Sequence, residues 1–207
     1  KDFIMEHLRI GIPMGFQMSV LTIGIIVLQF VLNGLGSIAV ASYTSAMRVE
    51  QIFSQSLVAL GATMATYTAQ NFGAGKMSRI KQGTKCAVSI GIGICVFSFI
   101  MLTFFADEFV SIFMREANDE IIYLGSMYLH IIMLFMIFLA ILLIFRNILQ
   151  GMGQAMVPLL SGFSELVLRG LCALILGHFF AAWIGASIVL FSGYKISLLK
   201  RLKALRK

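Results

Sequence analysis

Apolar runs of about twenty residues recur along this sequence and are separated by short polar segments. A helix needs roughly 20 mostly apolar residues to span a bilayer, and these runs reach that length. Charged residues make up only 12% of the chain and the mean hydropathy is +0.96. A soluble domain carries about twice that share of charged residues. The sequence therefore predicts an all-α polytopic membrane protein.

The runs predict six transmembrane helices that form one lobe over residues 10–199. Residues 1–9 alternate apolar and charged side chains, so we expect an amphipathic lead-in that lies at the membrane interface. Residues 200–207 form a basic tail. The expected helices are about 10–32, 42–70, 86–105, 121–150, 158–177 and 180–198.

Lysine and arginine gather in three segments, which are the lead-in, residues 76–85 and the tail. If six helices alternate, these segments fall on one side of the membrane and the acidic loop at 106–120 falls on the other. Because basic loops stay in the cytoplasm, we expect a multi-pass protein of the cell (plasma) membrane with both ends cytoplasmic. This topology accounts for the net charge of +7 without nucleic acid. Membrane lipid is the partner expected at the basic surface.

The helix expected at 42–70 is apolar overall, yet polar and small side chains follow one of its faces at steps of three and four residues. Polar groups are expensive in hydrocarbon, so such a face normally meets a protein interior or a wet cavity. Glu50 falls nearly opposite Arg48 on the helical wheel, so these two residues are not an obvious pair. The stripe consists of Arg48, Gln51, Gln55, Ala59, Ala62, Thr66 and Ala69.

Polar side chains also follow the first expected helix. Gln29 and Asn33 are four residues apart, which places them on the same face. Two interpretations of this pair stay open: the side chains line a cavity, or they form hydrogen bonds to another helix.

Ionisable residues within the predicted transmembrane helices indicate function more specifically than the uncharged polar residues do. Charges at membrane depth must be paired or hydrated. Glu165 and Arg169 are four residues apart, so we expect them to pair along their own helix. This pair is either a structural lock between helices or part of a transport route, and the sequence does not decide between them. Arg146 is expected to extend to the inner membrane surface.

The sequence contains no catalytic or metal-binding pattern. Gly73-Ala74-Gly75-Lys76 lacks the first glycine of a phosphate-binding loop, and Met77 replaces the metal-binding Ser or Thr of that motif. The three histidines lie on different segments. The three cysteines lack the spacing of a metal site, and each lies in or beside an apolar run. We therefore expect no enzyme activity, no catalytic residue, no metal and no cofactor.

A series of short motifs extends from residue 11 to residue 169. The motifs are Gly11-Ile12-Pro13; Gly36 and Ala39-Val40-Ala41; Arg48 and Glu50; Gln70-Asn71-Phe72-Gly73-Ala74-Gly75; Arg146; Leu149-Gln150-Gly151-Met152-Gly153; and Pro158, Gly162, Glu165 and Arg169. In this order and spacing, they resemble the second half of a multidrug and toxic compound extrusion (MATE) transporter.

The resemblance implies two six-helix lobes, of which this chain supplies the second. Such transporters export drugs or other amphipathic organic cations by alternating access, which Na⁺ or H⁺ drives. The implied partners are a small amphipathic substrate and a complementary six-helix half, in the same chain or separate. The implied cavity wall consists of Gln17, Gln29, Asn33, Arg48, Gln51 and Gln55.

Some members of the family carry carboxylates at the positions that align with Leu21 and Leu139. Because both positions are leucine here, the site for the coupling ion is expected in the first half of the transporter. Two alternatives remain open. One is a flippase for lipid-linked substrates from the same superfamily, which should have a more cationic cavity than Arg48 alone provides. The other is a truncated remnant or membrane scaffold that transports nothing.

Overall fold

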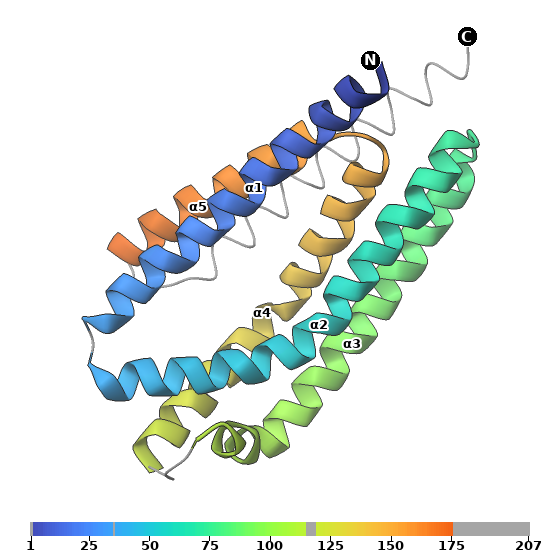
Figure 1. Cartoon of the computed structure of the whole chain (residues 1–207). Helices are drawn as coiled ribbons and strands as arrows, with labels where there is room; N and C mark the ends of the chain where they lie inside the picture. Colours follow the sequence, from blue (N-terminus) through green and yellow to red (C-terminus); the bar gives the residue numbers. More distant parts are fainter. Residues whose placement is uncertain (1, 35, 115–118, 176–207) are drawn as a thin grey trace.

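The computed structural model describes residues 2–34, 36–114 and 119–175, which form five helices and no strand (Figure 1). The helical prediction is confirmed for these residues. The helix expected at 180–198 and the tail at 200–207 lie outside them. The helices are α1 (Asp2–Asn33), α2 (Ser37–Gly73), α3 (Met77–Ile112), α4 (Asp119–Gly151) and α5 (Met156–Ile175).

Two helices begin well before the predicted boundaries. α1 starts at Asp2, so most of the lead-in continues directly into the first helix. α3 starts at Met77, so most of the basic segment at 76–85 is helical and is not a loop. Gly75, with a φ of 68°, completes the turn that precedes α3. Lysine, arginine, glutamine and methionine are good helix formers, so the helix continues through this polar sequence. The interfacial location of residues 1–9 stays a prediction.

The described helices divide into a group of three and a pair. α2, α3 and α4 pack against one another around buried aliphatic side chains such as Leu57, Leu102 and Leu142. α1 and α5 lie side by side and make few contacts with the other three helices (Figure 1). Few contacts therefore join the α1–α5 pair to the group of three helices. The polar contacts among them are consequently important for holding the two groups together.

α2 and α4 approach each other closely at glycines. A Cβ atom added at Gly151 would lie 2.4 Å from the carbonyl oxygen of Ala65 and 3.1 Å from Cβ of Thr68. A Cβ atom added at Gly61 would lie 2.7 Å from Nδ2 of Asn147. Small residues allow helix backbones to approach in this way, which increases van der Waals contact within a bilayer. Both glycines therefore set the distance between α2 and α4.

The outward surface of α3 is apolar. Phe97, Phe99 and Phe104 are exposed, as expected for side chains that face lipid. α3 and α4 are each long and apolar enough to cross a membrane by length and composition. Shorter apolar stretches occur at Gly11–Ile26 and Met156–Val167.

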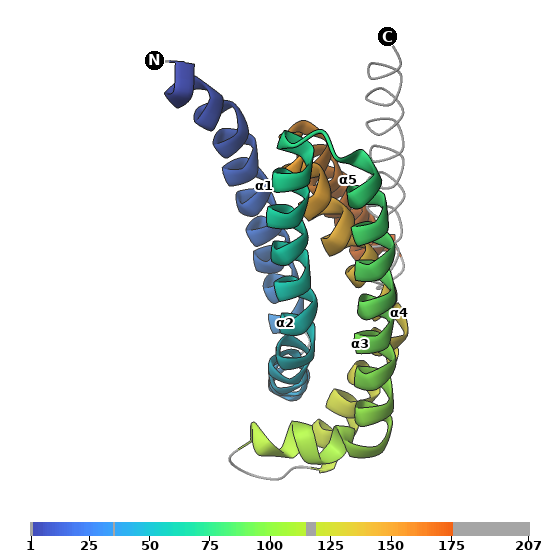
Figure 2. The same cartoon turned by 90° about the vertical axis from the view of Figure 1, so that its right-hand side faces the viewer.

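α3 bends at Phe105, which has a φ of −126° and a ψ of 19°. Beyond this residue, the last turns of α3 run across the end of the bundle (Figure 2). Exposed acidic side chains occupy this end at Asp107 and Glu108, whereas exposed basic side chains lie at Lys76, before α3, and at Arg79 in the first turn of α3. These acidic and basic side chains therefore lie at opposite ends of the bundle. The location of the chain ends in the cytoplasm stays a prediction.

Gly151→Ala is expected to destabilise the protein, because the added methyl group would contact the Ala65 carbonyl and separate α2 from α4. Overpacking of this kind costs about 1–3 kcal/mol. The measurement is thermal unfolding of the purified protein in detergent, followed by circular dichroism.

Gly93→Ala is the matched control, since a Cβ atom at this helical position would meet nothing within 4 Å. Alanine stabilises a helix relative to glycine by up to about 1 kcal/mol, so this variant should unfold at an equal or higher temperature. Equal unfolding temperatures for both variants and the unmodified protein would contradict the close approach of α2 and α4.

Candidate functional site

The face of α2 that turns away from α4 carries the polar stripe predicted from the sequence. The opposite face packs into the core through buried side chains such as Val49, Leu57 and Met64. α2 thus has one dry face and one polar face. The role of the polar face as a substrate surface stays a prediction. We call this surface the α2 polar face, and its exposed residues are Arg48, Gln51, Gln55, Ala59, Ala62, Thr66 and Ala69.

Gln29 and Asn33 are also exposed, near the end of α1. Nε2 of Gln29 donates a hydrogen bond to Oδ1 of Asn33 over 3.3 Å. This bond runs along α1 and does not reach another helix. The two amides therefore satisfy part of each other's hydrogen-bonding capacity while their outer surfaces remain open.

Gln17 lies in a different environment from the other predicted cavity residues. Its side chain is only 2% exposed, and its Oε1 atom accepts a hydrogen bond from Nε2 of Gln150 over 3.2 Å. A Cβ atom added at Gly162 would lie 3.2 Å from Cγ of Gln17, so this glycine leaves room for the glutamine side chain. In this conformation, Gln17 belongs to the contact between α1, α4 and α5 and not to an open cavity wall.

Arg146 does not extend to the membrane surface as the sequence analysis expected. Its side chain is buried, and Nη2 donates a hydrogen bond over 3.0 Å to Oε2 of Glu165, whose residue is 3% exposed. The ion pair joins α4 to α5, whereas the sequence predicted a pair between Glu165 and Arg169. The side chain of Arg169 lies outside the described residues. A buried cation requires a counter-charge, and the position of α5 against α4 supplies one.

The two polar contacts of α4 arise from neighbouring turns of the helix. Gln150 is four residues after Arg146, so both side chains project from the same face of α4. Gln150 reaches α1 and Arg146 reaches α5. These contacts therefore attach the α1–α5 pair to the group of three helices. We call them the α4 polar anchor, which consists of Gln17, Arg146, Gln150 and Glu165.

The sequence analysis missed a second set of polar contacts toward the other end of α4. The hydroxyl group of Tyr128 donates a hydrogen bond over 3.0 Å to Oε2 of Glu50 in α2. The hydroxyl group of Ser126 donates one to Oδ1 of Asp107 in α3. The helical wheel already placed Glu50 away from the α2 polar face. Identifying Tyr128 as its partner required the alignment of α2 with α4, which the sequence does not give.

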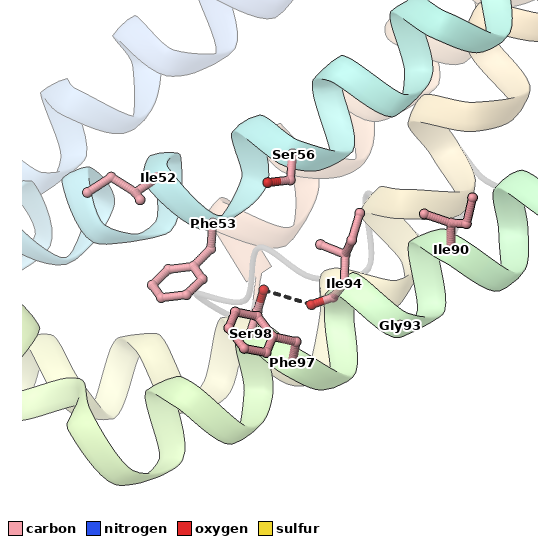
Figure 3. A pocket seen from close by; sticks show the side chains of 8 residues that line it. All are labelled: Ile52, Phe53, Ser56, Ile90, Gly93, Ile94, Phe97 and Ser98. Carbon is pink, nitrogen blue, oxygen red and sulfur yellow. Dashed lines mark hydrogen bonds between the residues drawn. The ribbon is translucent and has the colours of Figure 1, made fainter.

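A groove of about 470 Å³ lies between α2 and α3 (Figure 3). Its walls are mainly apolar, and the hydroxyl group of Ser98 bonds to the carbonyl oxygen of Ile94 in its own helix. The groove therefore offers a hydrophobic surface beside the α2 polar face. The residues that line it are Ile52, Phe53, Ser56, Ile90, Gly93, Ile94, Phe97 and Ser98.

The MatE family model matches residues 13–175, which include the described part of all five helices apart from the start of α1. The chain belongs to the MatE family. It is therefore a helical membrane protein of a family of transporters, which are not enzymes.

A curated relative in this family is the probable multidrug resistance protein YpnP of Bacillus subtilis (strain 168). The two sequences are 26% identical over 179 residues, which make up 86% of this chain and 39% of YpnP. The chain thus spans well under half the length of this relative.

Two solved structures have a similar fold. One is the outward-facing conformation of a multidrug resistance MATE family transporter, with a TM-score of 0.71 and 20% identity. The other is a transporter from Pyrococcus furiosus, with a TM-score of 0.69 and 18% identity, whose binding pocket of reverse polarity suggests a different function for that protein. Each match covers 97% of this chain and 44% of the other chain. These matches establish the MatE fold for most of the chain.

Glu165→Gln is expected to lower the amount of folded protein and its unfolding temperature. The substitution leaves the buried Arg146 guanidinium without this counter-charge, and removing one partner of a buried ion pair costs about 3–5 kcal/mol. The measurements are the yield of monodisperse protein in detergent and its thermal unfolding.

The double variant Arg146→Met with Glu165→Met is the control. Removing both charges is often neutral or stabilising, so the double variant should be more stable than Glu165→Gln. A double variant that is as unstable as Glu165→Gln, or less stable, would contradict the importance of the ion pair.

Proposed function

We propose that this chain forms one six-helix lobe of a two-lobed secondary active transporter. The transporter would export drugs or other amphipathic organic cations across the plasma membrane by cation-coupled alternating access. Membership of the MatE family supports transport, and the B. subtilis relative is named as a probable multidrug resistance protein. The length of the match, 39–44% of the relatives described above, supports the proposal that a second lobe is required.

The observation that carries this proposal is the exposure of the α2 polar face. Arg48, Gln51 and Gln55 lie within a membrane-protein helix, yet no described helix covers them. Polar groups at membrane depth are tolerated where they meet protein or line a water-filled cavity. A second lobe opposite α2 would enclose such a cavity, and alternating access would then consist of one lobe rocking against the other.

The location of the coupling-ion site is proposed from two leucine positions. Leu21 and Leu139 occupy the positions where some family members carry carboxylates. We therefore assign the principal site for Na⁺ or H⁺ to the first lobe. The placement of both chain ends in the cytoplasm rests on the opposite locations of the basic and acidic side chains.

The flippase alternative receives less support. A cavity for anionic lipid-linked substrates would require several cationic side chains, but Arg48 is the only charged residue on the α2 polar face. A remnant or scaffold that transports nothing would be made without a complementary half. The intact mass of the native protein tests this alternative.

The intact mass of the native protein, isolated from its own membrane, is expected to be roughly twice the 22.8 kDa of this chain. A mass equal to that of this chain would contradict a two-lobed single chain. The lobe would then have to recruit a separate half before it could enclose a cavity.

Gln55→Leu is expected to change resistance to organic cations without changing the protein level. Leucine removes hydrogen-bonding capacity from the α2 polar face but leaves the packed face of α2 intact. The measurements are drug resistance of cells that express the protein at its native length, and quantification of the protein in their membranes.

Ser89→Leu is the matched control, since it replaces an exposed polar side chain on α3 with leucine away from the α2 polar face. It should leave resistance unchanged. If Gln55→Leu also leaves resistance to every tested cation unchanged, Gln55 does not belong to the substrate cavity.

A further inference from the structure

The groove between α2 and α3 is lined mainly by apolar side chains and by no charged residue. The hydroxyl group of Ser98 already bonds to the carbonyl oxygen of Ile94, which leaves the exposed Ser56 as the other polar side chain of its walls. A cation that left water for this groove would find no counter-charge. The chemistry of the walls therefore favours a hydrocarbon chain over the charged part of an organic cation.

The groove opens onto the apolar outer surface of α3. Ile90 and Phe97 lie toward opposite ends of its α3 wall and are 49% and 60% exposed (Figure 3). Gly93 lies between them, and a Cβ atom added there would meet nothing within 4 Å. Phe97 belongs both to the groove and to the outer surface that we expect to face lipid. A lipid chain can therefore enter the groove from the side, where it restores van der Waals contacts that an empty groove would lose.

The face of α3 that lines the groove also carries a cation. Arg79 lies in the first turn of α3, at the basic end of the bundle. Steps of seven, four, three and four residues connect it to Phe97, so these positions lie on one face of the helix. All of them are exposed, and they are Arg79, Cys86, Ile90, Gly93 and Phe97.

The Arg79 side chain is available to an anionic ligand. Among residues 2–34, 36–114 and 119–175, no carboxylate forms an ion pair with it. Its backbone is fixed, because the Tyr67 hydroxyl group of α2 donates a 3.0 Å hydrogen bond to the Arg79 carbonyl oxygen. A guanidinium group binds phosphate oxygens through two parallel hydrogen bonds. Arg79 is therefore a suitable contact for a lipid phosphate.

The distances along α3 fit one phospholipid. At 1.5 Å per residue, Ile90 lies roughly 16 Å and Phe97 roughly 27 Å from Arg79 along the helix axis. Half of a bilayer, headgroups included, is about 20–22 Å thick. A lipid with its phosphate at Arg79 thus reaches into the groove with the end of an acyl chain. The basic end of α3 is the predicted cytoplasmic end, and the cytoplasmic leaflet is the one that carries anionic lipids.

We propose that α3 carries a binding site for an anionic phospholipid, with Arg79 at the phosphate and one acyl chain in the groove between α2 and α3. This inference goes beyond the proposed transport function, since it requires only that the protein lies in a membrane. The acyl chain fills the space between the two helices on the side next to the α2 polar face. The bound lipid therefore stabilises the position of α2 relative to α3.

The test uses native-length protein in liposomes and phosphatidylglycerol with a diazirine group near the end of one acyl chain. After illumination, mass spectrometry of peptides should place the label on residues 52–56 of α2 and 90–98 of α3. Gly93→Phe fills the groove from α3 and should lose the label on residues 52–56. Val96→Phe is the matched control, since Val96 is exposed on α3 but does not line the groove.

Ser56→Phe is an independent variant, because it fills the groove from α2. It should lose the label on Ile94, which lies on the opposite wall. Thermal unfolding in detergent identifies any variant whose loss of label comes from misfolding. The Ser56 variant then decides the test if Gly93→Phe does not fold.

Arg79→Gln tests the headgroup contact. It should lower labelling of the groove by the phosphatidylglycerol probe about fivefold, the contribution expected of one cation near a membrane surface. Labelling by the matching phosphatidylcholine probe should stay unchanged, and Arg79→Lys should retain most of the preference for phosphatidylglycerol. Lys81→Gln is the matched control, since Lys81 is exposed and projects from a different side of α3.

Four results would overturn the proposal. If both groove-filling variants fold and keep the label, the groove does not hold the acyl chain. If Arg79→Gln and Lys81→Gln lower labelling equally, Arg79 does not select the headgroup. If excess tetraphenylphosphonium displaces the label from the unmodified protein but unlabelled phosphatidylglycerol does not, the occupant is an organic cation. If the label reaches only the outer surface of α3, protein covers the groove. None of these measurements requires transport, so they are independent of the proposed function.

Discussion

The buried ion pair between Arg146 and Glu165 determines how the described helices are joined. Two charges in a dry environment are tolerated only when they satisfy each other, so neither α4 nor α5 can move independently by more than this contact allows. The hydrogen bond between Gln17 and Gln150 extends the same restraint to α1. Because the α1–α5 pair otherwise makes few contacts with the other helices, these polar side chains fix its position.

α2 combines a structural and an exposed surface in one helix. Gly61 allows close packing against α4, while Gln51 and Gln55 remain open on the other side. An exposed polar face would be unfavourable against lipid, and under the proposed function this face would meet a second lobe or a wet cavity. The same constraint explains why a chain with an extensive core in α2, α3 and α4 still leaves one face of α2 uncovered.

The sequence predicted the helical class and the polar stripe, because both depend on local periodicity. It did not predict the starts of α1 and α3, since good helix formers extend a helix beyond the apolar span. It also predicted an ion pair between Glu165 and Arg169, because Arg169 is the nearest opposite charge along the same helix. The contact with Arg146 depends on which faces of α4 and α5 meet. The burial of Gln17 depends in the same way on tertiary packing, which a helical wheel does not contain.

Two of the contacts that α4 makes with carboxylates lie roughly 27 Å apart along a helix that rises 1.5 Å per residue. At one, Arg146 pairs two full charges in a buried site. At the other, Tyr128 bonds to a single half-buried carboxylate, Glu50. Loss of charge at Glu165 would leave a buried cation, whereas loss of charge at Glu50 leaves a neutral hydroxyl group with an available partner. The Arg146 contact therefore holds α4 against α5 through two charges, whereas the Tyr128 contact holds α4 against α2 through one.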